Sequence, residues 1–389
     1  MLGACQLKRL DWPVVVTLFA LLAFGWPYMN SASYRSGPEG RGHVTSSPRK
    51  QLVWIAAGAV LALALLAIKY RALSELSLLF YLGGLAMLAI VLKYGEVVNG
   101  AKSWIVLSKS ARFQPSEFVK ITTILALAQY LGAERRPWTM GRILGGLAIV
   151  GVPVLMIAKQ PDLGTALMFV PAAGAMIFVA GARLKHLGML AAAAIVLMPI
   201  VWLGMNDTQK GRVKTWVQQD RKLTQRERVG RFHHLIQSKV AIGSGGWYGK
   251  GLGKGTQNKL NYLGFRNTDF VFAVICEEAG FIGANVVILF YLVIAAAGLS
   301  IARSCREPVG RLIAVGVVSL LLAQGFVNIA MTVGLLPIVG VTLPFVSYGG
   351  SSTLSSFLAV SLLLNVGLRR PRITFAREEL GIGPDGGGR

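Results

Sequence analysis

Apolar runs of nearly 20 residues recur from one end of this 389-residue chain to the other. The hydrocarbon core of a bilayer needs about 20 apolar residues for each helix that crosses it. Charged residues make up only 15% of the chain, against about 25% in soluble domains. The runs are continuous rather than alternating, which excludes a membrane β-barrel. The sequence therefore predicts an all-α polytopic membrane protein and excludes a soluble enzyme, a disulfide scaffold and a disordered chain.

Ten spans are expected within a single transmembrane domain, residues 1–389. They are 14–33, 52–68, 73–92, 115–132, 142–158, 163–181, 186–205, 280–302, 310–333 and 351–368. A long loop, residues 206–268, separates spans seven and eight. An even number of spans places both termini on one side, and the Lys and Arg content of the short segments favours the cytoplasm. Loop 206–268 is then extracytoplasmic, and residues 371–389 form a basic cytoplasmic tail.

Loop 206–268 carries 13 Lys or Arg residues against three acidic residues. Loops of this length are usually functional. Residues 210–240 mix apolar and basic residues as an interfacial amphipathic helix does. The glycine-rich stretch GSGGWYGKGLGKGT, residues 243–256, predicts a tightly turning loop with exposed backbone. The net charge of the chain is +23, which in a membrane protein indicates loops that bind anionic lipid, with no nucleic acid partner.

Four charged residues stand at the ends of predicted spans, where charge is costly and marks function by default. Glu117 and Lys120 lie three residues apart and therefore on one helix face. They either serve a site or simply pair with each other, with Glu117 complementing the helix dipole. Asp162 and Asp269 each precede a helix, so each is either an N-cap or a carboxylate of a site.

Two further segments break the helical pattern. Residues 269–302 are too long for one span, which predicts a short helix at 269–279 before a break near Gly280. Residues 334–350, GLLPIVGVTLPFVSYGG, are apolar and uncharged but interrupted by Pro and Gly. Irregular backbone at membrane depth is tolerated only where it is buried or lines a cavity. These features predict an outward-facing cavity, ringed by cations and holding carboxylates, that suits a phosphate-bearing, lipid-linked substrate.

At these same residues the sequence resembles the SEDS family (shape, elongation, division and sporulation), from about residue 14 to 368. The matching stretches are GAKSWIVLSKSARFQPSEFVK (100–120), QPDLGTAL (160–167), QSKVAIGSGGWYGKGLGKGTQ (237–257), TDFVFAVICEEAGFIG (268–283) and GLLPIVGVTLPFVSYGGSS (334–352). The third stretch is similar to that of the elongation member. The resemblance implies a peptidoglycan glycosyltransferase that polymerises lipid II, an undecaprenyl-pyrophosphate disaccharide, on the outer face of the bacterial plasma membrane during elongation.

The resemblance maps the family's essential aspartate onto Asp269, which we expect to act as general base. The residues expected to bind substrate, from the family motifs, loop 206–268 and the segment before the last span, are Glu117, Lys120, Asp162, Trp104, Lys50, Lys239, Lys250, Lys254, Arg266 and Ser347. The family commonly reads LPExHTDF where this chain reads LGFRNTDF, residues 263–270. The neighbours of the aspartate therefore differ, and Arg266 is expected to contact pyrophosphate in their place.

The sequence requires no cofactor. A divalent cation, Mg²⁺ or Mn²⁺, would suit the carboxylates, but no ligand spacing identifies a metal site. The resemblance implies a class B penicillin-binding protein transpeptidase as partner, together with other membrane proteins of the elongation complex. Two alternatives are a lipid II flippase that uses the same cavity and a non-catalytic scaffold for a transpeptidase. The charges cluster toward one face, whereas a carrier needs a site that both sides reach.

Overall fold

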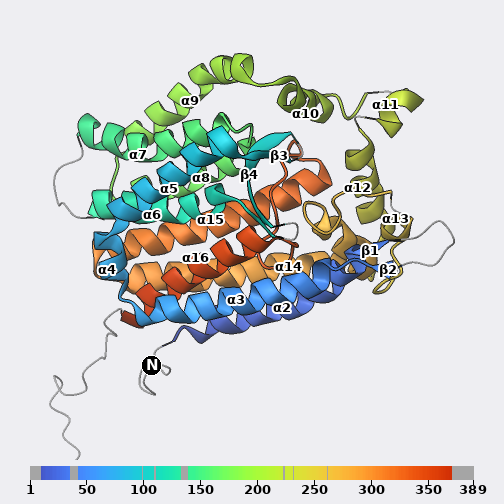
Figure 1. Cartoon of the computed structure of the whole chain (residues 1–389), viewed down its shortest axis with the longest axis horizontal. Coiled ribbons are helices and arrows are strands. Elements are labelled where there is room, and N and C mark those ends of the chain that lie inside the picture. The colour runs from blue at the N-terminus through green and yellow to red at the C-terminus, as the bar shows by residue number, and fades with distance from the viewer. Residues whose placement is uncertain are drawn as a thin grey trace, which may run out of the picture.

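Each of the ten predicted spans forms a helix in the computed structural model of the chain (Figure 1). These helices are α2 (Trp12–Ala32), α3 (Ser47–Ala67), α5 (Ser77–Tyr94), α6 (Pro115–Gly132), α7 (Met140–Ala158), α8 (Leu163–Val179), α9 (Leu184–Gly204), α14 (Val271–Ser304), α15 (Pro308–Val333) and α16 (Gly350–Arg369). Among the described helices, seven are long and apolar enough to cross a bilayer, and α8 is a shorter apolar helix. The chain is therefore a multi-pass, predominantly helical membrane protein, as predicted.

Helix α2 begins, and helix α16 ends, at the same end of the bundle. Asp11, just before α2, lies against Gly367 near the end of α16. An even number of crossings requires this arrangement. The structure describes residues 10–35, 43–98, 100–108, 111–132, 139–221, 224–230, 232–260 and 262–369. The predicted basic tail, residues 371–389, lies outside them.

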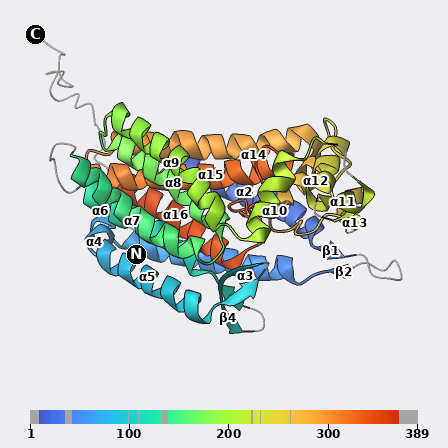
Figure 2. The ribbon, with the colours of Figure 1, turned by 90° about the horizontal axis from the view of Figure 1, so that it is seen from above.

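Helices α15 and α16 form the centre of the bundle, with α3, α6, α8 and α14 packed around them (Figures 1 and 2). In the most apolar stretch of each helix, 78% of residues are buried in α15 and 83% in α16, against 17% in α3. A helix that is apolar all round belongs inside a bundle or a membrane. Outer helices expose apolar side chains such as Leu78 and Leu79 of α5, as a lipid-facing surface requires.

Short elements gather at one end of the bundle. The helices there are α10 (Asp207–Val217), α11 (Gln225–Val229), α12 (His233–Ser244) and α13 (Thr256–Lys259), and the strands are β1 (Tyr34–Arg35) and β2 (His43–Val44) (Figure 1). The short helix α4 (Tyr70–Glu75) lies at the opposite end. Of these elements, α10 lines the cavity described below.

The prediction of one amphipathic helix over residues 210–240 is wrong, because the chain forms three short helices there. The first break follows Val217. The carboxylate of Glu227 then accepts the backbone N–H and the hydroxyl of Thr224, each at 3.0 Å. It also pairs with the guanidinium of Arg221. These contacts satisfy the free donors at the start of a new helix, α11.

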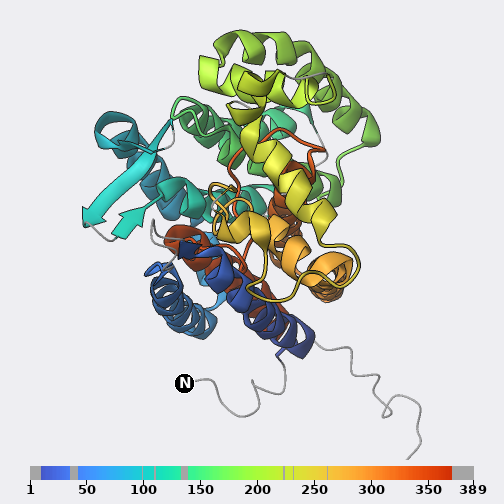
Figure 3. The same ribbon diagram turned by 90° about the vertical axis from the view of Figure 1, so that its right-hand side faces the viewer.

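An antiparallel ribbon that the sequence analysis did not predict precedes α6. It consists of β3 (Glu96–Val98), β4 (Ala101–Ser108) and β5 (Ala111–Phe113) and extends to one side of the bundle (Figure 3). Glu96 pairs with Trp104 in its register. The sequence signal was the Asn-Gly pair at 99–100, which is typical of a hairpin turn. The ribbon directs Trp104 toward the cavity.

The predicted break in the eighth span is confirmed, because Gly280 within α14 has φ 68° and ψ −160°. The glycine-rich stretch 243–256 packs against this break. The N–H of Phe281 donates to the carbonyl of Gly246 at 2.8 Å. A Cβ on Gly249 would lie 2.2 Å from the carbonyl oxygen of Glu278. The tight turns are therefore as predicted, but part of their backbone is packed against α14 rather than exposed.

Candidate functional site

A cavity of about 440 Å³ lies at the end of the bundle that carries the short helices. The predicted site residues that line it are Asp269, Glu117, Lys120, Asp162, Trp104 and Lys50. Residues 339–342 and 348–349 form another part of its wall. They belong to the irregular chain between α15 and α16, so the prediction that this broken segment lines a cavity is confirmed.

Glu117 and Lys120 form a buried ion pair in the first turns of α6. The Lys120 Nζ lies 2.9 Å from Glu117 Oε1, and the hydroxyl of Ser355 donates to Glu117 Oε2 at 2.9 Å. The two residues are only 6% and 2% exposed. The residues therefore pair with each other, as one of the two readings predicts, and they also line the cavity. The Ser355 contact ties this pair to α16.

Asp162 combines an N-cap with a position on the cavity wall. Its carboxylate accepts the backbone N–H of Thr165 at 3.1 Å and the Thr165 hydroxyl at 2.9 Å. The side-chain amide of Gln114 donates to it at 2.9 Å. Burial raises the pKa of Asp162, while the hydrogen bonds from Thr165 act in the opposite direction. Asp162 therefore fixes the start of α8 against the chain that enters α6.

Asp269 stands on a tight turn and is not the N-cap of α14, a position that Phe270 occupies. The carbonyl of Phe265 accepts the backbone N–H groups of Thr268, Asp269 and Phe270 at 3.1, 2.9 and 3.2 Å. Phe265 has φ 51°, a left-handed conformation that is uncommon outside glycine. This conformation aims one carbonyl at three consecutive N–H groups. The side chain of Asp269 is left to line the cavity.

The irregular segment before α16 holds the Asp269 turn from the other side. The hydroxyl of Ser347 donates to the carbonyl of Thr268 at 2.5 Å. The N–H of Tyr348 donates to the carbonyl of Asn267 at 2.8 Å. From α15, the side-chain amide of Asn328 donates to the carbonyl of Asp269 at 2.9 Å. These bonds use backbone atoms of the turn, so they hold it without occupying the Asp269 carboxylate, which lines the cavity.

Burial raises the pKa of the Asp269 carboxyl to about 6, although the Thr268 hydroxyl and the charge of Arg212 act in the opposite direction. A carboxylate with this pKa holds a proton more readily than an ordinary aspartate. It is also largely ionised at neutral pH. Asp269 is therefore suited to accept a proton from a substrate, since an effective base has a pKa near the working pH.

The ring of His234 packs beneath the Asp269 turn. It lies 5.9 Å from the ring of Phe265 and 6.3 Å from that of Phe270, between ring centroids. Its Nδ1 is buried and has no hydrogen-bond partner among the described residues. A Cβ on Gly264 would lie only 2.5 Å from Cε1 of His234. The ring occupies the space that a larger residue 264 would need, so glycine fits at this position.

Replacing Gly264 by Ala is expected to destabilise the protein by about 1–3 kcal/mol, the usual cost of overpacking. The new methyl group collides with the His234 ring, and φ plays no part because Gly264 has no positive φ. The double variant Gly264→Ala/His234→Ala should regain much of the loss. Thermal unfolding in detergent measures both effects. A Gly264→Ala protein as stable as the wild type would contradict this packing.

The basic residues predicted in the middle of loop 206–268 lie outside the cavity. Lys239 Nζ donates to the side-chain oxygen of Gln219 at 2.8 Å. Lys250 Nζ forms an ion pair with Glu277 at 2.7 Å. The exposed Lys254 does not line the cavity. The sequence showed that this loop is basic, but not which of its cations reach the site.

Arg266 and Ser347 also lie outside the cavity lining, on either side of the Asp269 turn. Arg266 is 8% exposed, and its guanidinium donates to the backbone carbonyls of Ala32, at 2.7 Å, and Tyr34. The structure therefore does not bring Arg266 to the position where a substrate pyrophosphate would lie. It instead attaches the turn to the end of α2. Ser347 supports the turn through Thr268, as described above.

Cavity residues that the sequence analysis missed include Arg112, Gln114 and Arg212. Arg212 on α10 interacts electrostatically with Asp269, although 57 residues separate them in sequence. The only signal for Arg212 was the basic character of its loop. Gln114 precedes Pro115 in the QPSE motif and could have been found there. The cavity thus holds four cationic side chains, from Lys50, Arg112, Lys120 and Arg212, beside three carboxylates.

Three carboxylates, those of Glu117, Asp162 and Asp269, line the cavity. Among the described residues, no group of three or more His, Cys, Asp and Glu side chains could hold a metal ion. Glu117 and Asp162 already have hydrogen-bond partners. The arrangement can bind polyanions through its cations. It can also take up a proton at Asp269.

A family model described as Cell cycle protein (FTSW_RODA_SPOVE) matches residues 12–371. The peptidoglycan glycosyltransferase MrdB of Escherichia coli K12 is 32% identical over 367 residues, which cover 94% of this chain and 95% of that protein. The peptidoglycan glycosyltransferase RodA of Treponema pallidum is 30% identical over 428 residues, covering 92% of this chain and 98% of that protein.

Solved structures agree with these sequence matches. The crystal structure of the rod shape determining protein RodA of Thermus thermophilus has a TM-score of 0.69 at 28% identity, over 93% of this chain and 98% of that chain. A chain from a structure described as the coordination of polymerization and crosslinking by a peptidoglycan synthase complex has a TM-score of 0.76 at 29% identity, over 92% and 97% of the two chains. The whole-length resemblance predicted from the five motifs is confirmed.

Proposed function

This chain belongs to the FtsW/RodA/SpoVE family of cell cycle proteins and is a peptidoglycan glycosyltransferase of cell elongation. We propose that it polymerises lipid II in the cavity described above, with Asp269 as the general base. The observation that carries the proposal is the position of Asp269. It is a carboxylate of raised pKa on a tightly held turn, and it lines a cavity that also holds four cations.

The reaction joins an acceptor sugar hydroxyl to the anomeric carbon of a second, pyrophosphate-linked sugar. The new bond forms between the hydroxyl oxygen and the anomeric carbon, while the bond from that carbon to the pyrophosphate breaks. Asp269 takes the hydroxyl proton, and the bonding electron pair leaves with the polyprenyl pyrophosphate. A direct displacement of this kind inverts the anomeric carbon.

Positive charge must stabilise the departing pyrophosphate. Lys120 and Arg212 are the proposed groups, with Glu117 orienting Lys120 and Asp162 orienting Gln114. This scheme needs no resident cofactor. A divalent cation, Mg²⁺ or Mn²⁺, would have to share ligands with the substrate pyrophosphate, because the described residues offer no metal cluster of their own. No step in the scheme is assigned to such an ion.

The proposed location is the bacterial plasma membrane, with both termini in the cytoplasm and the cavity facing outside. The positions of basic residues in short loops support this orientation. The proposed partner is a class B penicillin-binding protein transpeptidase, since one structural neighbour comes from a complex that couples polymerization with crosslinking. Anionic lipid around the basic loops and other membrane proteins of the elongation complex complete the proposed surroundings.

The test is polymerisation of purified lipid II by the detergent-solubilised protein together with its transpeptidase partner. Glycan strands longer than the disaccharide are expected. A parallel assay in vesicles follows lipid II translocation. Translocation without polymer would identify a flippase, and neither activity together with intact stimulation of the transpeptidase would identify a scaffold.

The rate of polymerisation should fall as the pH drops below about 6, because Asp269 must be ionised to accept a proton and its pKa is raised to about 6. Arg212 favours the ionised form, so Arg212→Gln should move this limb of the profile to higher pH. The measurement is kcat/KM between pH 5 and 8. A limb that stays at the same pH in Arg212→Gln would mean that another group titrates.

A further inference from the structure

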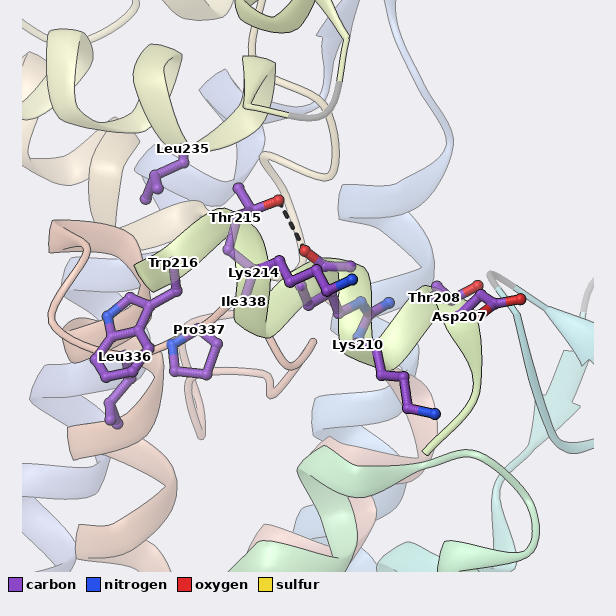
Figure 4. A pocket seen from close by; sticks show the side chains of 12 residues that line it. Asp207, Thr208, Lys210, Lys214, Thr215, Trp216, Leu235, Leu336, Pro337 and Ile338 are labelled. Carbon is purple, nitrogen blue, oxygen red and sulfur yellow. Dashed lines mark hydrogen bonds between the residues drawn. The ribbon is translucent and has the colours of Figure 1, made fainter. Parts of the chain in front are cut away.

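A second groove, of about 450 Å³, runs beside the catalytic cavity (Figure 4). Helix α10 forms one wall, and Leu235 of α12 and residues 336–338 form the rest. The side-chain N–H of Trp216 donates to the carbonyl of Gly334 at 3.2 Å, which ties the far end of α10 to the chain after α15. The mechanism above assigns nothing to this groove.

The groove is divided into an apolar part and a cationic part. Figure 4 shows Trp216, Leu336 and Pro337 at one end, while Lys210 and Lys214 extend toward the other. With Arg212, these lysines face a single carboxylate in the lining, that of Asp207. Lys214 is exposed and forms no ion pair within the described part of the chain, and Lys210 donates only to a backbone carbonyl at 3.4 Å.

This division matches an amphiphile that has a phosphate-rich head and a hydrocarbon tail. Lys and Arg bind phosphate through charge-assisted hydrogen bonds. Beyond the apolar end of the groove, Leu335 and Val217 are 68% and 67% exposed. These exposed apolar side chains give a hydrocarbon tail that leaves the groove there an apolar surface to contact.

The groove is continuous with the catalytic cavity, because Thr208 and Arg212 line both. The proposed reaction joins two lipid-pyrophosphate substrates. A cavity of about 440 Å³ is of the size that holds one drug-sized ligand. The second pyrophosphate and its lipid therefore need a separate place beside the first. Arg212 lines both places and shares the cavity wall with Asp269.

We propose that this groove binds the pyrophosphate and the first isoprene units of the donor strand, and that the polyprenyl pyrophosphate product leaves through it. The inference rests on the proposed function. The acceptor sugar lies in the catalytic cavity against Asp269. When the anomeric carbon–oxygen bond breaks, the electron pair passes to a pyrophosphate oxygen that Arg212 stabilises, together with Lys120 from the cavity and Lys214 from the groove.

Direct binding of farnesyl pyrophosphate to the purified full chain in detergent tests the proposal without requiring catalysis. Lys210→Gln/Lys214→Gln should weaken binding at least about tenfold, the order expected for a lost charge-assisted hydrogen bond. The charge control is Arg228→Gln, an exposed cation of the same loop that does not line the groove. Phosphatidylglycerol is the competitor that identifies a site for any anionic lipid.

A second pair of variants tests the volume of the groove. Gly211 lines the groove, and a Cβ placed on it meets nothing within 4 Å. Gly211→Phe should therefore fill the groove without straining the fold and reduce binding. Gly243 in α12 is also a helical glycine with open space but lies outside the groove, so Gly243→Phe is the matched control.

The proposal predicts that both groove variants lose farnesyl pyrophosphate binding, slow polymerisation and become less sensitive to added polyprenyl pyrophosphate, whereas both controls behave as the wild type. It is overturned if the groove variants bind the probe normally, or if phosphatidylglycerol competes equally well. If instead the proposed function is wrong, the wild type makes no polymer, whether or not it binds farnesyl pyrophosphate.

Discussion

Replacing Asp269 by Asn is expected to slow glycan polymerisation by about 10²–10⁴-fold, the usual contribution of a general base. Asn has nearly the same shape but does not accept a proton at neutral pH. The turn should survive, because its hydrogen bonds to Phe265, Ser347 and Asn328 use backbone atoms. The measurement is the initial rate of strand formation from lipid II in the presence of the transpeptidase partner.

A suitable control for this variant is Asp220→Asn, which changes an exposed carboxylate of loop 206–268 that lines neither the cavity nor the groove. It should polymerise at the wild-type rate. Thermal unfolding of both variants establishes that each is folded. Near-wild-type polymerisation by a folded Asp269→Asn protein would show that another group takes the proton.

Replacing Lys120 by Met is expected to destabilise the protein by about 3–5 kcal/mol, because it leaves the buried carboxylate of Glu117 without its counter-charge. The two atoms of the pair are 2.9 Å apart, and within the described part of the chain the Ser355 hydroxyl would be the remaining side-chain partner of Glu117. The readout is a fall in the thermal unfolding midpoint in detergent.

The double variant Lys120→Met/Glu117→Gln separates stability from chemistry. It removes both charges, so most of the stability should return, while polymerisation stays low if Lys120 stabilises the leaving group. The control is Arg71→Gln, which breaks an ion pair whose Arg side chain is 67% exposed. Exposed pairs contribute about 0–1 kcal/mol, so little change is expected there. A double variant that regains both stability and activity would leave Lys120 with a purely structural role.

The helices of this protein could be predicted from sequence because each span is specified locally. About 20 consecutive apolar residues must form a helix in lipid, since their backbone groups have no water to bond with. The break at Gly280 could be predicted from the excess length of residues 269–302, and the irregular chain after Gly334 from its Pro and Gly residues. The ribbon before α6 was missed although its Asn-Gly pair is a hairpin signal. The division of residues 210–240 into three helices was missed because side-chain caps, rather than the apolar pattern, decide where those helices begin.

The candidate site was only partly predictable. Asp269, Glu117 and Lys120 could be identified because charge at the end of an apolar run is costly and is seldom kept without a use. Arg212 could not, because nothing in its local sequence distinguishes it from the other cations of its loop. Arg266 shows the converse: beside Asp269 in sequence, it is directed away from the cavity by two backbone carbonyls of another segment.

The sequence by itself thus determined that the chain crosses a membrane many times and that its carboxylates stand at helix ends, since both follow from the transfer of single segments between water and lipid. Only the tertiary structure decided which cations meet Asp269 and that a second groove shares Arg212 with the cavity. Those features depend on where α10 packs against residues 334–340. Contacts between segments more than 100 residues apart are set by the packing of the whole bundle.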